Sequence, residues 1–285
     1  MERVFFTAAL VSIGISVAIV LSLAGRALAF VTNVDPGVLW ADGWFPRSGQ
    51  YDIRTIIAGT LVISGIGMLV ATPLGLGAAV YLSEYARPKV RRLIKPILEL
   101  LAGIPSVVIG FFALVFISPD LVQRIFPSAG IFNMLAAGIG VGILVIPLVA
   151  SISEDALRAV PTSLREASVG LGARKRMTTM RVVLPAAISG IVASLIVGVS
   201  RAIGETMVVA MVAGASGGSL LELDPLEPGQ TMTAAMTALA IGSDQVKGAE
   251  HTFESLFFVG LLLFFATLLL NVVGERFVRR VRQRY

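Results

Sequence analysis

Six long apolar stretches divide this chain of 285 residues, and each is long enough to cross a lipid bilayer as an α-helix. A membrane-spanning helix needs about 20 residues, because the hydrocarbon core is about 30 Å thick. Since 56% of the residues are apolar and only 14% are charged, one soluble core could not cover all the apolar side chains. We therefore predict an all-α integral membrane protein with six transmembrane helices. The spans are expected at about residues 4–23, 55–82, 98–117, 131–153, 183–213 and 256–273.

The basic residues between these stretches gather on one side of the predicted membrane domain. The N-terminus, the second and fourth loops and the C-terminal tail together hold 17 Lys and Arg residues, whereas the other three loops hold 5. Because basic loops tend to stay in the cytoplasm, both termini are predicted to be cytoplasmic. The net charge of +5 could also indicate nucleic-acid binding, but the sequence offers no continuous basic surface for that role.

The N-terminal stretch allows a second interpretation. Arg3, the apolar run and Ala27-Leu28-Ala29 also resemble a secretory signal peptide with a small-residue cleavage site. The apolar run of about 20 residues is longer than the apolar region of most signal peptides, and Arg26 interrupts it just before the cleavage site. A retained first helix also keeps both termini on the basic side, so we expect it to be retained.

Composition limits the chemistry that the chain can perform. There is no cysteine and only one histidine, His251, which excludes thiol chemistry and argues against His-based catalysis or metal binding. The sequence contains no Gly-x-x-x-x-Gly-Lys-Ser/Thr string, and it therefore has no P-loop for ATP. We expect no enzyme activity, no cofactor and no metal. Active transport would have to draw on an ion gradient or on a separate ATPase subunit.

The fourth loop contains signals for a short cytoplasmic helix followed by a turn. Pro161 ends the preceding helix, and Ser163 and Glu166 have the spacing of a capping box at the start of a new one. Gly172 permits a sharp turn, and Leu184-Pro185 leads into the fifth span. These residues predict an exposed amphipathic helix on the cytoplasmic face.

The same loop resembles the EAA loop of ABC importer permeases. The matching pattern is Glu166-Ala167-Ser168, three residues, Gly172, nine residues, Val182, one residue and Leu184-Pro185. In that family the loop forms a coupling helix that binds in a cleft of the ATPase subunit. The resemblance therefore implies an ATPase-coupling role for Ser163, Glu166, Ala167, Gly172, Leu184 and Pro185.

Four further strings resemble the phosphate permeases of the PstC and PstA kind. They run from Thr72 to Tyr85, from Glu99 to Phe112, from Ser153 to Pro161 and from Arg201 to Met207. The resemblance implies a type I ABC importer permease fold in the bacterial inner membrane. It also implies passage of inorganic phosphate, a heterodimer with a second permease, two copies of a cytoplasmic ATPase and a periplasmic phosphate-binding protein.

The long loop after the first span and the Arg-rich C-terminal end favour the PstC type over PstA. We expect residues 1–54 to form the first helix and an outer loop, and residues 55–274 to form the permease domain. The coupling loop lies at about 154–182, and residues 275–285 form a basic cytoplasmic tail.

The fifth predicted span carries a charged pair in apolar surroundings. Arg201 and Glu205 are one helical turn apart on the side of the small residues Ser194, Gly198 and Ala202, where another helix can approach closely. A charge near mid-membrane costs about 3 kcal/mol even on lenient scales, so such residues are usually paired and usually functional. With Thr206, this pair is the predicted substrate pathway; the alternative is a salt bridge that only fixes helix packing.

Two other functions remain open from the sequence. One alternative keeps the ABC importer class but changes the cargo to another oxyanion, such as sulfate, molybdate or phosphonate. An ion-coupled secondary transporter would predict inverted repeats and further buried carboxylates or histidines in the spans. The sequence shows neither feature, which favours the ABC importer.

Overall fold

The structure is a computed structural model that describes residues 1–40, 42–214, 217–241 and 251–281. The six predicted spans are confirmed as six long apolar helical stretches. Their bounds are Arg3–Asn33, Ile53–Tyr85, Ser106–Ile125, Met134–Arg158, Lys175–Ile203 and Thr252–Arg280. The third begins later than predicted, and the fifth begins and ends earlier.

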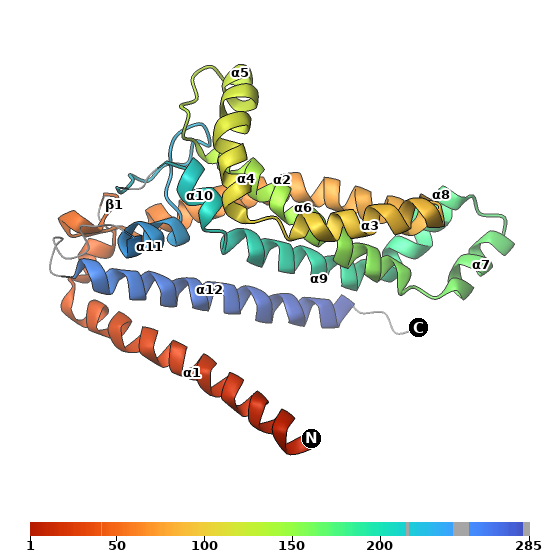
Figure 1. The fold of residues 1–285 in the computed structure, drawn as a ribbon, viewed down its shortest axis with the longest axis horizontal. Helices are drawn as coiled ribbons and strands as arrows, with labels where there is room; N and C mark the ends of the chain where they lie inside the picture. Colours follow the sequence, from red (N-terminus) through yellow and green to blue (C-terminus); the bar gives the residue numbers. More distant parts are fainter. Residues whose placement is uncertain (41, 215–216, 242–250, 282–285) are drawn as a thin grey trace.

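The centre of the molecule is a bundle of three helices. These are α2 (Ile53–Val80), α6 (Met134–Arg158) and α9 (Leu184–Ile203), which lie along the long axis in Figure 1. Glycines allow α2 and α6 to approach closely: a Cβ on Gly138 would lie 2.6 Å from the Cβ of Ile66, and one on Gly142 would lie 2.8 Å from the Cβ of Val70. Small residues allow tight packing of membrane helices, and the bundle is therefore a rigid frame for the rest of the chain.

The third span is broken into pieces with different directions. α3 (Pro88–Ala102) lies along the bundle, whereas α4 (Ser106–Phe112), the π-helix η4 (Ala113–Val122) and α5 (Gln123–Ile125) rise steeply away from it (Figure 1). The break falls at Gly103 and Ile104, because Pro105 disfavours a helical conformation in the residue before it. The third apolar span therefore begins at Ser106 and not at residue 98, and the break falls at Gly103-Ile104-Pro105 inside the predicted range.

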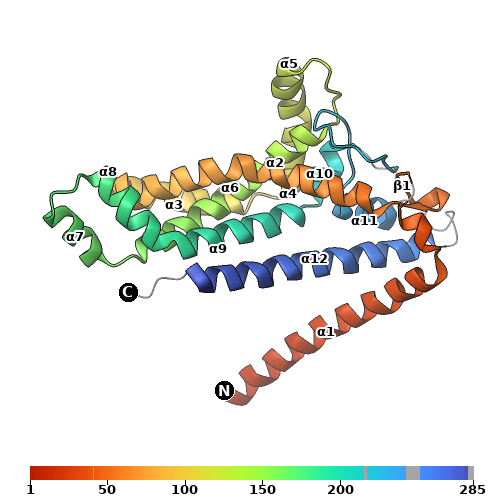
Figure 2. The same cartoon turned by 180° about the vertical axis from the view of Figure 1, so that it is seen from behind.

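The first and last helices lie outside the central bundle. α1 (Glu2–Asn33) approaches α12 (Thr252–Val281) at one end, where Phe30 is buried and stacks on Phe258. From there α1 diverges toward its N-terminus, as Figure 2 shows. The helix continues without a break through residues 27–29, and Ala27 is buried.

Short elements cover the end of the bundle near the start of α2. A hairpin pairs β1 (Trp44–Phe45) with β2 (Gln50–Tyr51); the 3-10 helix η1 (Pro36–Trp40) precedes it, and the 3-10 helix η2 (Pro46–Ser48) joins its two strands. The same end holds α10 (Met207–Val212) and α11 (Met232–Ile241), as Figure 2 shows. α11 is an apolar helix of 10 residues, which is too short to span the membrane.

The opposite end holds the connections that are rich in basic residues. It includes the π-helix η3 (Tyr81–Tyr85), α7 (Thr162–Gly170), α8 (Lys175–Thr178) and the π-helix η5 (Thr179–Val183), and α12 runs toward it (Figure 2). The positive-inside rule assigns this end to the cytoplasm. Three basic residues used in the charge count, Lys247, Arg282 and Arg284, lie outside the described residues.

Candidate functional site

Arg201 and Glu205 form the predicted ion pair, but not within one helix. α9 ends at Ile203, and Glu205 lies in the short break before α10. The Arg201 Nη1 atom is 2.7 Å from the Glu205 Oε2 atom. The glutamate side chain is only 2% exposed, whereas the arginine side chain is 44% exposed. The continuous span predicted at 183–213 is therefore wrong, because Gly204 ends the helix one residue before the carboxylate.

Hydrogen bonds from two elements hold the break in place. The Val208 backbone N–H donates to Glu205 Oε1 at 3.4 Å, which places the carboxylate at the start of α10. The Thr233 hydroxyl, at the start of α11, donates to the backbone oxygen of Glu205 at 2.7 Å. The predicted Thr206 lies beside the pair, and its hydroxyl donates to the Gly204 backbone oxygen at 3.3 Å. Glu205 is thus fixed by its surroundings, while Arg201 is open on one side.

The small-residue side of α9 faces protein, as predicted. Ser194 is fully buried, and its hydroxyl lies 2.6 Å from that of Ser153 on α6. A Cβ on Gly198 would lie 3.1 Å from a Val149 methyl group. Ala202 is also buried. This packing fixes the rotation of α9 about its axis, and it sets the direction in which Arg201 leaves the helix.

The predicted cytoplasmic helix is present as α7, but its start differs from the prediction. α7 begins at Thr162 after Pro161, and no side chain caps its first turn. Ser163 and Glu166 both lie within the helix and are exposed, without a side-chain hydrogen bond among the described residues. The capping box is therefore wrong, because Pro161 places Ser163 inside the first turn and not before it.

The predicted turn at Gly172 is a Schellman motif at the end of α7. The Gly172 N–H donates to the Val169 oxygen at 2.9 Å, and the Ala173 N–H donates to the Ser168 oxygen at 3.1 Å. Gly172 has a φ of 80°, in the left-handed region that glycine occupies without a Cβ clash. Glycine is thus required by backbone conformation here, since a Cβ would meet no neighbouring atom.

α7 presents an apolar surface that nothing in the described chain covers. Leu171 is 89% exposed and Val169 is 60% exposed, next to the exposed residues Glu166 and Ala167. Leu164, on the other side of the helix, packs against the cluster of apolar residues between α2, α6 and α9. A helix that packs on one side through a partly buried residue and exposes apolar side chains on another is suited to docking against another protein.

Leu184 and Pro185 lie where the coupling segment joins the helix that carries Arg201. α8, η5 and α9 form one helical stretch, Lys175–Ile203, so three basic residues of the fourth loop, Lys175, Arg176 and Arg181, lie within it. Pro185 stands in the first turn of α9, and Leu184 packs against the same cluster as Leu164. The Ser168 and Thr178 hydroxyls, 2.9 Å apart, connect α7 to the start of this stretch.

Arg165 is a functional candidate that the sequence did not reveal. Its guanidinium donates to the backbone oxygens of Leu157 and Val160, at the end of α6, and to Glu84 of η3 at 3.0 Å. One side chain therefore connects α7 to two spans. A basic residue one turn after a helix break is suited to helix-end oxygens, but Glu84 is 81 residues away and no local signal indicates it.

A second unpredicted cluster surrounds the buried Glu154 near the end of α6. Its carboxylate contacts Arg91 at 2.7 Å and Lys95 at 2.8 Å, both from α3, and Lys95 also contacts Asp155. Burial alone would lower the pKa of Lys95, but its hydrogen bonds to Asp155 and Glu154 raise that pKa above its ordinary value. Lys95 is thus charged at neutral pH and connects α3 to α6. No group of His, Asp or Glu in the described ranges could hold a metal ion.

Comparisons with known proteins place these features in one family. Residues 71–285 match the family of binding-protein-dependent transport system inner membrane components. A probable ABC transporter permease, YqgH of Bacillus subtilis, is 35% identical and aligns over 96% of this chain and 90% of its own. The phosphate transport system permease protein PstC 1 of Mycobacterium tuberculosis is 34% identical over 83% of this chain and 75% of its own.

Solved structures share the fold at low sequence identity. The bacterial alginate ABC transporter, in complex with an alginate-bound periplasmic protein, has a chain that aligns with a TM-score of 0.67 and 16% identity, covering 99% of this chain and 96% of its own. A chain of the inward-facing MetNI methionine ABC transporter aligns with a TM-score of 0.61 and 20% identity, covering 81% and 96%. These likenesses confirm the predicted type I ABC importer permease fold.

Proposed function

The chain belongs to the family of binding-protein-dependent transport system inner membrane components, and from this premise we propose that it is a PstC-type permease subunit that passes inorganic phosphate. The family and the six spans make it a multi-pass protein of the inner membrane. The cargo is inferred from relatives that are named phosphate transport system permease proteins.

The observation that carries the proposal is the half-exposed guanidinium of Arg201 beside a fully buried carboxylate. Moving a multiply charged anion out of water without compensating groups costs tens of kcal/mol, and a cation must therefore face its path. A guanidinium can offer two parallel donors to a tetrahedral oxyanion. Glu205 neutralises Arg201 when no anion is present, and Thr206 adds a hydroxyl beside the pair.

The energy for transport comes from a separate ATPase that docks on α7. The exposed residues Glu166, Ala167 and Leu171 form the docking surface, and the Gly172 turn sets its angle to the following helix. Because Lys175–Ile203 is one helical stretch that begins just after this turn and ends just past Arg201, displacement of α7 by the ATPase is transmitted to the anion site. Coupling is thus mechanical, through Leu184 and Pro185.

The full importer has two copies of the ATPase, a second permease and a periplasmic phosphate-binding protein. The diverging part of α1 and the exposed Phe111, Phe112 and Phe116 of the third span provide apolar surface for the second permease and for lipid. Residues 1–54 form the outer helix with its loop, and residues 55–274 form the permease domain. Residues 154–182 are the coupling loop, and 275–285 are the cytoplasmic tail.

Transport assays with competing anions test the cargo. Membranes that carry this chain with its partners should accumulate radiolabelled phosphate when ATP is supplied. Excess unlabelled phosphate should abolish the signal, whereas sulfate, molybdate and phosphonate at the same concentration should leave most of it. Equal competition by sulfate would move the assignment to another oxyanion, and uptake without the ATPase would contradict the importer class.

A further inference from the structure

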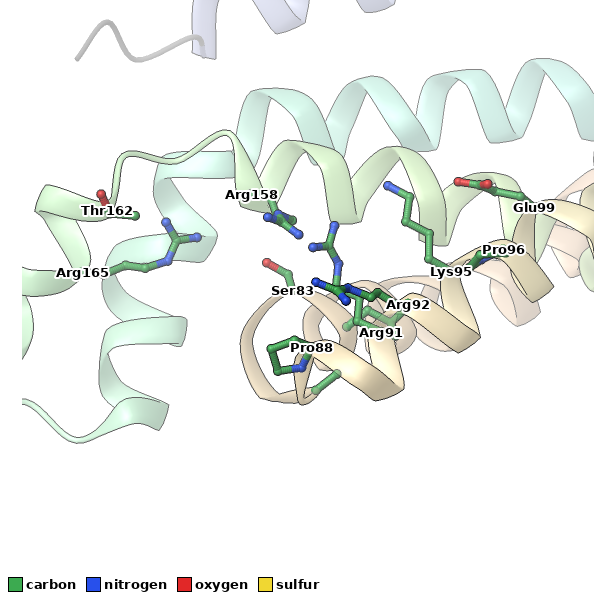
Figure 3. Close-up of a pocket in the computed structure, with 12 residues that line it drawn as sticks. Ser83, Pro88, Arg91, Arg92, Lys95, Pro96, Glu99, Arg158, Thr162 and Arg165 are labelled. Atoms are coloured by element: carbon green, nitrogen blue, oxygen red, sulfur yellow. The ribbon is translucent and has the colours of Figure 1, made fainter.

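A cavity of about 780 Å³ opens at the cytoplasmic end of the chain, away from the Arg201 site. It lies between η3, α3, the end of α6 and the start of α7 (Figure 3). Five of its lining residues are basic: Arg91, Arg92, Lys95, Arg158 and Arg165. Neither Arg201 nor Glu205 lines this cavity, and the two basic sites are therefore distinct.

The carboxylates around the cavity neutralise only some of these cations. Glu154 contacts Arg91 and Lys95, while Glu84 contacts Arg165. By contrast, Arg92 and Arg158 make no ion pair with any residue that the structure describes. The Nε atom of Arg91 is also buried and has no hydrogen-bond partner among the described residues.

Three of the basic side chains gather on one side of the cavity. Figure 3 shows the guanidinium groups of Arg91, Arg92 and Arg158 gathered beside the hydroxyl of Ser83, with Arg165 across the cavity. Glu99, the only acidic side chain that lines the cavity among the described residues, lies beyond Lys95 at the far end of the group. Positive charges gathered on one side of a cavity repel one another, so an anion bound between them would lower the electrostatic energy.

We propose that this cavity binds a phosphate group on the cytoplasmic side of the membrane. Guanidinium forks match the oxygen atoms of a phosphate, and several converging arginines are typical of phosphate sites. The cavity is larger than a single phosphate ion needs. It therefore accepts either free inorganic phosphate with water or the phosphate of an anionic lipid headgroup.

The position of the site gives it a mechanical consequence. Arg92 belongs to α3, Arg158 ends α6, and Arg165 belongs to the coupling helix α7. A phosphate group held by Arg92 and Arg158 would connect α3 to the end of α6, beside Arg165 of the coupling helix, more tightly than the protein contacts alone. The inference stands independently of the proposed cargo, because it concerns residues outside the transport path.

Binding assays on the assembled complex test the site. The complex of this chain with its partner permease and ATPase is placed in nanodiscs of neutral phosphatidylcholine, and radiolabelled phosphate is titrated. The double variant Arg92→Gln and Arg158→Gln is compared with Arg87→Gln and Lys89→Gln, which removes two charges from the same surface outside the cavity. A complex with Arg201→Gln separates binding in the transport path from binding in the cavity.

If free phosphate is the ligand, the cavity variant should bind it about tenfold more weakly or worse, because it lacks two charged hydrogen-bond donors. The surface control and the Arg201→Gln complex should retain phosphate binding in the cavity. If a lipid is the ligand, native mass spectrometry of nanodiscs with phosphatidylglycerol should show one retained anionic lipid that only the cavity variant loses. Equal phosphate and lipid binding by the cavity variant and the surface control would overturn the proposal.

A second readout needs no variant. Phosphate or phosphatidylglycerol should slow backbone hydrogen exchange of the wild-type complex at residues 81–99 and 158–166. If neither ligand slows exchange there, the cavity does not bind a phosphate group, whatever the folding of the variants. If the cavity binds no phosphate group, phosphate uptake by the importer would be unchanged. If phosphate is not the cargo, only the uptake assay would show it.

Discussion

Arg201 and Arg165 both donate to a glutamate, yet their surroundings assign them different tasks. Arg165 is 22% exposed, and its guanidinium also donates to two backbone oxygens at the end of α6. Arg201 is 44% exposed, and Glu205 is its one ion-pair partner among the described residues. A guanidinium whose donors are used holds elements together, whereas one with spare donors can take a ligand. The comparison assigns a structural role to Arg165 and a binding role to Arg201.

The largest effect on phosphate uptake should come from replacing Arg201, whose guanidinium has spare hydrogen-bond donors. Arg201→Gln should lower phosphate uptake by roughly a hundredfold or more, because two charge-assisted hydrogen bonds to the anion are lost. The amount of chain in the membrane should stay the same, since Arg201 is half-exposed. Radiolabelled uptake is measured per mole of assembled complex, with Arg124→Gln as the matched control, because Arg124 forms a similar ion pair with Asp120. Equal losses in both variants would remove the distinction.

Replacing Arg165 should have a different effect, because this residue holds elements of the fold together. Arg165→Gln should cost about 1–3 kcal/mol of stability, since the backbone oxygens at the end of α6 lose a charged donor. Thermal unfolding of the purified complex should shift downward, and ATP hydrolysis and uptake should fall together. Arg176→Gln, an exposed change nearby, serves as the control. A variant with normal stability and selectively lost uptake would give Arg165 a binding role.

Gly172→Val sharpens the comparison at the coupling segment. A β-branched residue at a φ of 80° costs about 1–3 kcal/mol, so the turn after α7 should change its angle. The chain should stay in the membrane, but co-purification of the ATPase or phosphate-stimulated ATP hydrolysis should be lost. Gly170→Ala, in the helical part of α7 with no neighbouring atom close to its Cβ, should have little effect. Normal coupling in Gly172→Val would contradict the assignment.

The smallest effect is expected for Glu205→Gln. The amide keeps the hydrogen bond from Val208 but loses the charge that neutralises Arg201. Uptake should fall by less than about tenfold, because the anion site itself remains. A leak of phosphate without ATP should appear in proteoliposomes, since Arg201 then lacks its competing carboxylate. A loss as large as that of Arg201→Gln would mean that the pair acts only as a packing salt bridge.

Local signals explain why much of the architecture could be predicted. Apolar runs indicate six spans, Gly172 indicates the turn, and the residue before Pro105 indicates the bend in the third span. Each of these depends on neighbours within a few residues. The pairing of Arg201 with Glu205 was also predicted, because four residues separate them.

Long-range contacts explain the rest. The contact of Arg165 with Glu84 joins residues 81 positions apart, and Glu154 takes its partners from α3, about 60 positions earlier. No pattern in one sequence indicates such pairs. The end of α9 at Gly204 was also missed, since a glycine within an apolar helical run is tolerated in many membrane helices. The hydrogen bond from Thr233 to the Glu205 backbone, which holds the break, becomes visible only in the fold.

The most direct test of the account counts phosphate imported per ATP hydrolysed in proteoliposomes that contain the full importer. With Arg201→Gln, this ratio should fall at least tenfold while ATP hydrolysis continues, because coupling through α7 is intact and only the anion site is lost. With Arg165→Gln, import and hydrolysis should fall together and the ratio should stay near that of the wild type. A wild-type ratio and rate in Arg201→Gln would contradict the account, since phosphate would then cross without this guanidinium.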